Sequence, residues 1–204
     1  MNFMKRLVCL LVLPLAFVVQ AAEKSPMVLP DVLVKTTVDE VLSAIKQTKD
    51  KRALHELAEK KVLSNFDFQA MTRSAVGRSW RDANPAQQKA LENGFRSLLV
   101  STYVTALSQS STSNQTVEVK PARINPEDTD VTVKTLVTEP GRKPIAIDYR
   151  MSKTASGWKV NDVVVENLSL VINYRGSFNS EIGRSGIDGL IKTLEEKNKQ
   201  LAAT

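Results

Sequence analysis

The chain has 204 residues, with 28 Lys and Arg against 22 Asp and Glu, one histidine and one cysteine. This length suits one domain with a sizeable core. The mildly basic balance comes without a basic patch interleaved with aromatic residues, so we expect no nucleic-acid binding. The single cysteine, Cys9, lies in an N-terminal apolar run. The rest of the chain therefore contains no disulfide, thiolate nucleophile or zinc–thiolate site.

The first 21 residues have the pattern of a cleavable secretory signal. Lys5 and Arg6 precede an apolar run from Leu7 to Val19, and small residues at Val19 and Ala21 suit a signal peptidase. The run has about 13 residues, whereas a membrane-spanning helix needs about 20. We therefore expect residues 1–21 to be removed and residues 22–204 to form a single soluble, exported domain.

Helical periodicity dominates the first half of the chain. The spacing of apolar residues predicts helices over 31–46, with Asp31 as N-cap, and over 50–62. A short helix follows within 65–80 and ends near Gly77. Asn84, Pro85 and Gln87 then have the pattern of a capping box that starts a helix of about 25 residues. Gly94 inside this helix predicts a close packing contact.

Strand periodicity dominates the second half, after a polar loop over 108–115. Alternating apolar residues predict strands over 116–119, 131–137, 145–151 and 158–165. The last strand runs straight into a helix over 168–183, which a second helix over 186–199 follows. Trp158 and Val163 have opposite parity in the last strand, which a β-bulge would reconcile. The pattern predicts an α+β fold, a twisted antiparallel sheet of about four strands wrapped by helices.

Few residues are suited to catalysis. His55 lies on a charged helix and is expected to be solvated. Asp148 beside Tyr149 is the best enzymatic candidate, but strand alternation directs the two side chains to opposite faces. Glycines at 176, 183, 186 and 189 suit a phosphate-binding nest less well than a break between two helices. We expect no catalytic residue, no metal site and no cofactor.

Large apolar side chains are the remaining candidates for a functional site. The set is Tyr103, Tyr149, Met151, Tyr174 and Phe178. Their pattern alone favours a hydrophobic core over a ligand cavity.

Several spaced blocks closely resemble the MlaC or toluene-tolerance family of periplasmic phospholipid carriers. The blocks, in order along nearly the whole mature chain, are Phe66-Asp67-Phe68, Gly77-Arg78-Ser79-Trp80, Gln87 with Phe95, Leu98-Leu99 with Tyr103, Asp148-Tyr149, Trp158 to Val163, and Ser169 to Arg175 with Phe178. The chain departs from the family pattern at Asn167, where Gly is commoner, and at Ser177, where a longer polar residue is commoner.

The resemblance implies a cystatin-like or nuclear-transport-factor-like fold that holds lipid acyl chains in an apolar cavity between sheet and helices. It also implies exchange of phospholipid in the periplasm with an outer-membrane lipoprotein complex and with an inner-membrane ABC transporter that has a lipid-binding ring, which maintains outer-membrane lipid asymmetry. A periplasmic enzyme or binding module for a hydrophobic small molecule is the alternative, and an interaction subunit or chaperone is a third reading.

A carrier needs a deep cavity with an apolar lining. From their shared apolar phases we expect the lining to include Leu99, Tyr103, Tyr149, Met151, Val163, Val165, Val171, Tyr174 and Phe178. We place Arg150 and Arg175 at its mouth, near the lipid head group.

Overall fold

The computed structural model describes residues 27–109 and 114–203, without the side chains of 104–109. The segment predicted to be a signal, 1–21, lies outside the described residues, as does part of the polar tract 108–115. The elements are α1 (Pro30–Gln47), α2 (Lys51–Leu57), η1 (Ala58–Val62), η2 (Leu63–Asn65), α3 (Phe68–Val76), η3 (Gly77–Arg81), α4 (Pro85–Gln109), β1 (Thr116–Val119), β2 (Asp130–Thr138), β3 (Ile145–Thr154), β4 (Gly157–Val165), β5 (Leu168–Ser169) and α5 (Leu170–Ala202).

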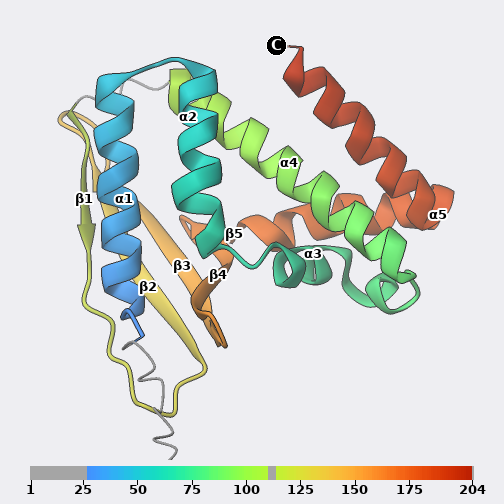
Figure 1. The fold of residues 1–204 in the computed structure, drawn as a ribbon, viewed down its shortest axis with the longest axis horizontal. Helices are drawn as coiled ribbons and strands as arrows, with labels where there is room; N and C mark the ends of the chain where they lie inside the picture. Colours follow the sequence, from blue (N-terminus) through green and yellow to red (C-terminus); the bar gives the residue numbers. More distant parts are fainter. Residues whose placement is uncertain (1–26, 110–113, 204) are drawn as a thin grey trace, which may run out of the picture.

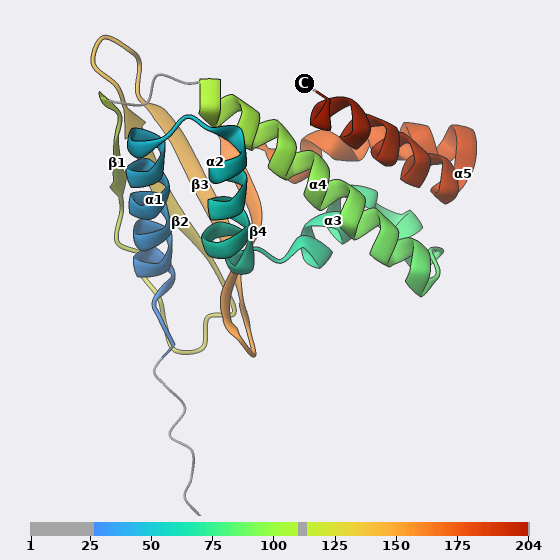
Figure 2. The same cartoon turned by 45° about the horizontal axis from the view of Figure 1, so that its top comes forward.

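The strands form one antiparallel sheet in the order β1-β2-β3-β4-β5. The α+β class is confirmed, and the sheet has five strands rather than about four because the short β5 pairs with β4. Helices α1 and α2 lie over one face of this sheet (Figures 1 and 2). Helices α3, α4 and α5 pack beside it as a separate helical half (Figure 1).

A bulge in β4 sets which of its side chains face the helices. Arg150 of β3 lies opposite Asp162, whereas the next residue, Met151, lies opposite Val160. The extra residue, Asn161, reverses the alternation, so Val160 and Val163 share one face of the sheet despite their spacing of three. The predicted bulge is therefore confirmed.

The connection from β4 to α5 differs from the prediction of a strand that runs directly into a helix. Val165 pairs with Leu168 across a two-residue turn in which Glu166 and Asn167 have φ of 48° and 67°. Positive φ at both central residues is typical of the type I′ hairpin turn, and Asn is among the residues that adopt it most readily. A Gly at position 167 is therefore not required for this turn. The hairpin leads the chain away from the sheet before α5 begins.

Helix ends follow local signals in most cases. Asn84 and Gln87 exchange side-chain to backbone hydrogen bonds of 3.0 and 2.9 Å, which confirms the capping box. The N-cap of α1 is Leu29 rather than Asp31, whose carboxylate accepts hydrogen bonds from the backbone N–H groups of Val32 and Ala122.

Of two further predictions about helices, one is only partly correct and the other is confirmed. The helix predicted over 50–62 is α-helical only to Leu57 and continues as the π-helix η1. The C-terminal helix has a break at Gly186, with φ of 72°, as expected.

Close packing joins the two long helices of the helical half. A Cβ atom on Gly94 of α4 would lie 3.1 Å from the Cβ of Leu194 on α5. This confirms the contact predicted from a glycine inside a helix, because a larger residue would push the helices apart.

The buried apolar residues form three clusters. The helical core lies between α3, α4 and α5 and includes Phe95 and Leu194. The sheet core lies between α1 and the strands and includes Val133 and Met151. A third, small cluster consists of Ile45, Leu54 and Val100.

Candidate functional site

An apolar cavity lies where the three clusters meet. It has two chambers: the helix chamber, of about 200 Å³, between α2, η1, α3, α4 and β4, and the sheet chamber, of about 530 Å³, between α1 and the strands. The residues that line both chambers are Val41, Ile45, Val62, Phe66, Tyr103, Val163 and Val165. Because these shared residues form the boundary between them, we treat the chambers as one site.

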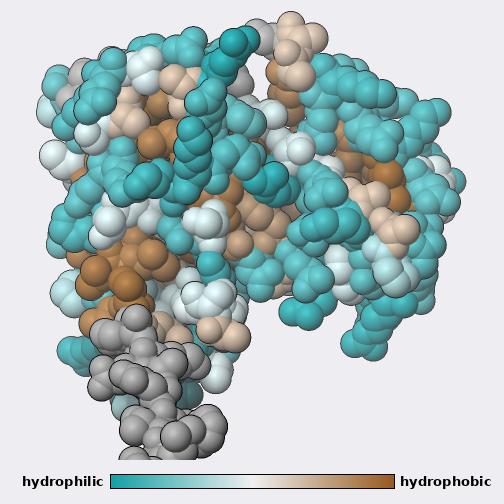
Figure 3. All heavy atoms as spheres, in the orientation of Figure 1, coloured by the Kyte–Doolittle hydropathy of each residue, from teal (hydrophilic) through white to brown (hydrophobic). Residues whose placement is uncertain are grey.

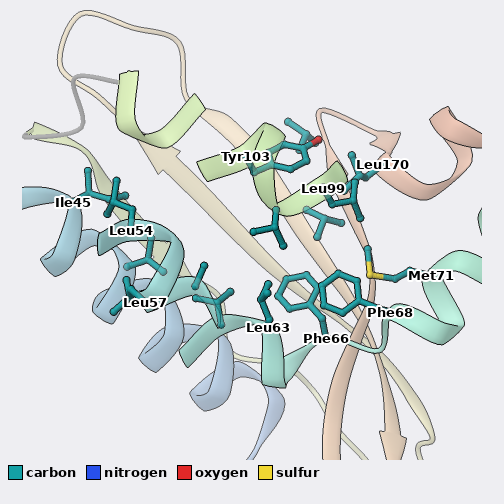
Figure 4. A pocket seen from close by; sticks show the side chains of 16 residues that line it. Ile45, Leu54, Leu57, Leu63, Phe66, Phe68, Met71, Leu99, Tyr103 and Leu170 are labelled. Atoms are coloured by element: carbon teal, nitrogen blue, oxygen red, sulfur yellow. The ribbon is translucent and has the colours of Figure 1, made fainter. Parts of the chain in front are cut away.

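The lining of the helix chamber consists almost entirely of hydrocarbon. Figure 4 shows the side chains of the 16 residues that line it, and the hydroxyl of Tyr103 is the only side-chain oxygen or nitrogen among them. Phe66 and Phe68 form a stacked pair with ring centroids 5.8 Å apart. Met71 lies beside Phe68, and Leu99 with Tyr103 on α4 lies across the chamber (Figure 4).

The sheet chamber is lined by one stripe of α1 and by the inward side chains of the strands. Its polar side chains are Thr37, Asn65, Tyr103, Gln115 and Tyr149. Thr37 donates to the carbonyl of Leu33 at 2.8 Å and accepts from the amide of Asn65 at 3.0 Å. No charged side chain lines either chamber among the described residues. Such a surface favours a hydrocarbon occupant over an ionic one.

The tyrosines of the site remain neutral near pH 7. Burial raises the pKa of Tyr149. Burial is also the main cause that raises the pKa of Tyr103, and electrostatic repulsion from Tyr174 raises it further. A neutral phenol that stays protonated offers a hydrogen-bond donor without placing a charge in the cavity.

Six of the nine predicted lining residues do lie along the cavity, namely Leu99, Tyr103, Tyr149, Met151, Val163 and Val165. Val171, Tyr174 and Phe178 do not. They belong to the helical core, where the rings of Tyr174 and Phe178 lie 5.0 and 5.1 Å from that of Phe95, edge to face. Of α5, the first residue, Leu170, lines the helix chamber. The apolar stripe further along α5 packs against α4 instead.

The two predicted mouth residues lie elsewhere as well. Arg150 is on the opposite face of the sheet and pairs with buried Asp162 at 3.1 Å. That carboxylate also accepts from the Ser169 hydroxyl at 2.6 Å and the Val171 N–H at 3.2 Å. Arg175 donates twice to the carbonyl of Ser74, at 3.0 and 2.7 Å. Both arginines therefore fasten α5 rather than border the cavity.

The enzymatic candidates remain apart from the cavity. Asp148 pairs in register with Lys134 and Val164, on the face opposite Tyr149, as strand alternation predicts. His55 is exposed on α2, 3.7 Å from a carboxylate oxygen of Glu59.

The described part of the chain has neither a metal-binding cluster nor a helix long and apolar enough to cross a membrane. No group of three or more His, Cys, Asp or Glu side chains there is placed to hold a metal ion. Nor does any helix within residues 27–109 or 114–203 combine the length and apolarity needed to cross a membrane.

One whole wall of the cavity was not predicted from the sequence. The stripe of α1 from Leu33 to Ile45 lines the sheet chamber, while Leu54 and Leu57 of α2 line the helix chamber. The periodicity of both helices identified these faces as buried, but gave no sign that they face a cavity. Phe66 lies between elements, where an isolated bridge to Val160 directs it inward, and no periodicity marks such a position.

Apolar residues also reach the surface near the start of α1. Met27, Val28, Leu29 and Val32 are exposed there, and Figure 3 shows apolar colour at the corresponding lower end of the sheet half. Apolar colour also appears in the hollow between the sheet half and the helical half (Figure 3).

The chain matches one protein-family model and is similar to a solved structure. The family model described as MlaC protein matches residues 35–196. A solved structure of a phospholipid-binding protein from Ralstonia solanacearum, in complex with a phospholipid, is 40% identical, with a TM-score of 0.76. The alignment covers 84% of this chain and 98% of that one. No curated protein matches the chain. The matched span and the shared fold show that the chain belongs to the MlaC protein family.

Proposed function

We propose that this protein binds a phospholipid, with the acyl chains in the cavity between the sheet and α1, α2 and α4. The observation that carries the proposal is the absence of charged side chains from the described lining of both chambers. The phospholipid complex of the 40% identical relative supports it.

The energetics favour an enclosed site for such a ligand. Sheltering one methylene from water is worth about 0.8 kcal/mol, so an acyl chain with about 15 of them gains about 12 kcal/mol before the costs of binding. The sheet chamber, at about 530 Å³, has the size typical of ligand cavities. An open groove would leave much of each chain in contact with water.

The head group stays outside the cavity. A phosphodiester carries a negative charge. The free-energy cost of burying this charge without a positively charged partner is far larger than the gain from burying the neighbouring part of an acyl chain. Since no lysine or arginine lines the described walls, the lipid enters with its tails leading.

The biological role is that of a carrier rather than an enzyme. Residues 1–21 direct export and are removed, and residues 22–204 carry phospholipid through the periplasm. The partners are an outer-membrane lipoprotein complex and an inner-membrane ABC transporter with a lipid-binding ring, and the exchange maintains the lipid asymmetry of the outer membrane. Membership of the MlaC family supports this role.

Native mass spectrometry of the mature protein, purified without detergent, tests the proposal. We expect a population whose added mass equals that of a phospholipid, and solvent extraction should recover the same species. A protein that is empty after purification and takes up no phospholipid from vesicles would overturn the proposal. A bound hydrophobic molecule that is not a lipid would favour the alternative, an enzyme or binding module for such molecules.

A further inference from the structure

A second concavity, the arginine pocket, lies on the helical half. It has a volume of about 790 Å³ and is formed by α3, η3 and α5. Its lining residues are Arg73, Ser74, Gly77, Arg78, Ser79, Trp80, Arg81, Arg175, Asn179, Ile182 and Gly183. Four of these are arginines and none is acidic. The pocket shares no residue with the phospholipid cavity, so acyl-chain binding does not account for it.

Local structure gathers the arginines in one place. η3 is a 3-10 helix, which has three residues per turn, so Arg78 and Arg81 point to the same side. Arg73 lies in the last turn of α3, just before this segment. Arg175 reaches across from α5 and is held by its two hydrogen bonds to the Ser74 carbonyl.

The four arginines of the pocket form no ion pair within the part of the chain that the structure describes. All four side chains, those of Arg73, Arg78, Arg81 and Arg175, are exposed. The neighbouring acid on α5, Glu181, is occupied by Arg184 and Ser185.

Clustered charges of one sign repel each other and lower the stability of the fold. An external anion would remove this repulsion.

We propose that the arginine pocket binds the phosphate groups of anionic phospholipids at a membrane surface. The guanidinium group matches phosphate oxygens with two parallel hydrogen bonds, which a lysine cannot do. The hydroxyls of Ser74 and Ser79 and the amide of Asn179 add neutral groups that can donate hydrogen bonds. The pocket is wider than a single phosphate requires, which suits a surface that presents many head groups. The protein would thereby be held at a membrane while its cavity remains free to hold lipid.

Sedimentation with vesicles tests this proposal. We expect the mature protein to bind vesicles made of equal parts phosphatidylglycerol and phosphatidylcholine, and not vesicles of phosphatidylcholine alone. Each arginine near an anionic surface contributes about 1 kcal/mol, or about fivefold in partitioning, so R78Q/R81Q should bind about 25-fold more weakly. Arg175 is left intact because it also holds the end of α3.

The matched control, R52Q/R123Q, removes the same charge from exposed arginines outside the pocket. We expect it to weaken binding by less than about fivefold, since only charges close to the surface contribute fully. Equal losses in the two double variants would mean that diffuse charge binds the vesicles, and would overturn the proposal. Failure of the wild-type protein to bind the anionic vesicles would also overturn the proposal.

Two further readouts distinguish a membrane site from a soluble-phosphate site and from a structural role of the arginines. If wild type ignores vesicles but binds inorganic phosphate in a calorimetric titration, and R78Q/R81Q does not, the pocket serves a soluble phosphate and the membrane proposal is wrong. If R78Q/R81Q keeps its co-purified phospholipid and unfolds at the same or a higher temperature, its loss of vesicle binding reflects neither an emptied cavity nor a damaged fold. Loss of both properties together would instead assign these arginines a structural role and contradict the proposal.

Discussion

Val163→Trp tests the cavity most sharply among single substitutions. Val163 lies on β4, in register with Tyr149, and lines both chambers of the cavity. An indole in its place projects into the boundary between the chambers. If it displaces about four methylenes at about 0.8 kcal/mol each, lipid binding loses about 3 kcal/mol. That loss corresponds to more than about 100-fold in affinity.

The assay is the phospholipid content per protein molecule, measured by extraction after purification, together with the thermal unfolding temperature. Thr132→Trp is the matched control, because Thr132 is exposed on the opposite face of the sheet. Overpacking by the new indole costs about 1–3 kcal/mol of stability. Val165→Trp, at a more exposed cavity position, serves as a second variant. Unchanged lipid content in both folded cavity variants would refute the placement of the acyl chains.

The other predictions concern stability and follow from single contacts. Gly94→Ala should destabilise the protein in chemical denaturation, because the 3.1 Å approach to Leu194 outweighs the gain of about 1 kcal/mol in helix propensity. Gly176→Ala meets nothing within 4 Å and should stabilise by up to about 1 kcal/mol. Stabilisation by Gly94→Ala would contradict the close packing of α4 on α5, and destabilisation by Gly176→Ala would contradict the open space beside that residue. Asp162→Asn weakens three hydrogen bonds of a buried carboxylate and should cost about 2–4 kcal/mol, more than Arg150→Gln, whose side chain is half exposed. Burial raises the pKa of Tyr149 above its ordinary 10.0, so the unfolded chain releases this proton first and stability falls as the pH rises past that value. Unfolding temperatures in alkali should therefore fall less steeply for Tyr149→Phe, and identical slopes would count against this burial.

Features fixed by neighbouring residues were predictable from the sequence. The capping box at Asn84 and Gln87 and the kink at Gly186 each depend on a few adjacent positions. The alternation that places Tyr149 inside and Asp148 outside depends only on the strand period. The same period applies to Arg150, the other neighbour of Tyr149, and it predicts the opposite face that the structure shows.

Features that depend on how elements dock were not predictable in this way. The stripe of Val171, Tyr174 and Phe178 is a buried helix face, as the period indicates. Periodicity cannot tell whether such a face meets a sheet or another helix. The two-residue turn at Glu166 and Asn167 decides this by directing α5 onto α4.

The proposed position of the acyl chain can be tested directly by photolabelling. The mature protein is loaded with a phospholipid that carries a diazirine near the end of one chain, irradiated, and digested for mass spectrometry. We predict labelling of peptides that contain cavity residues such as Phe66, Tyr103, Tyr149 and Val163. Labelling confined to the helical core around Phe95 and Phe178, or to the polar face of the sheet, would contradict acyl-chain binding in this cavity.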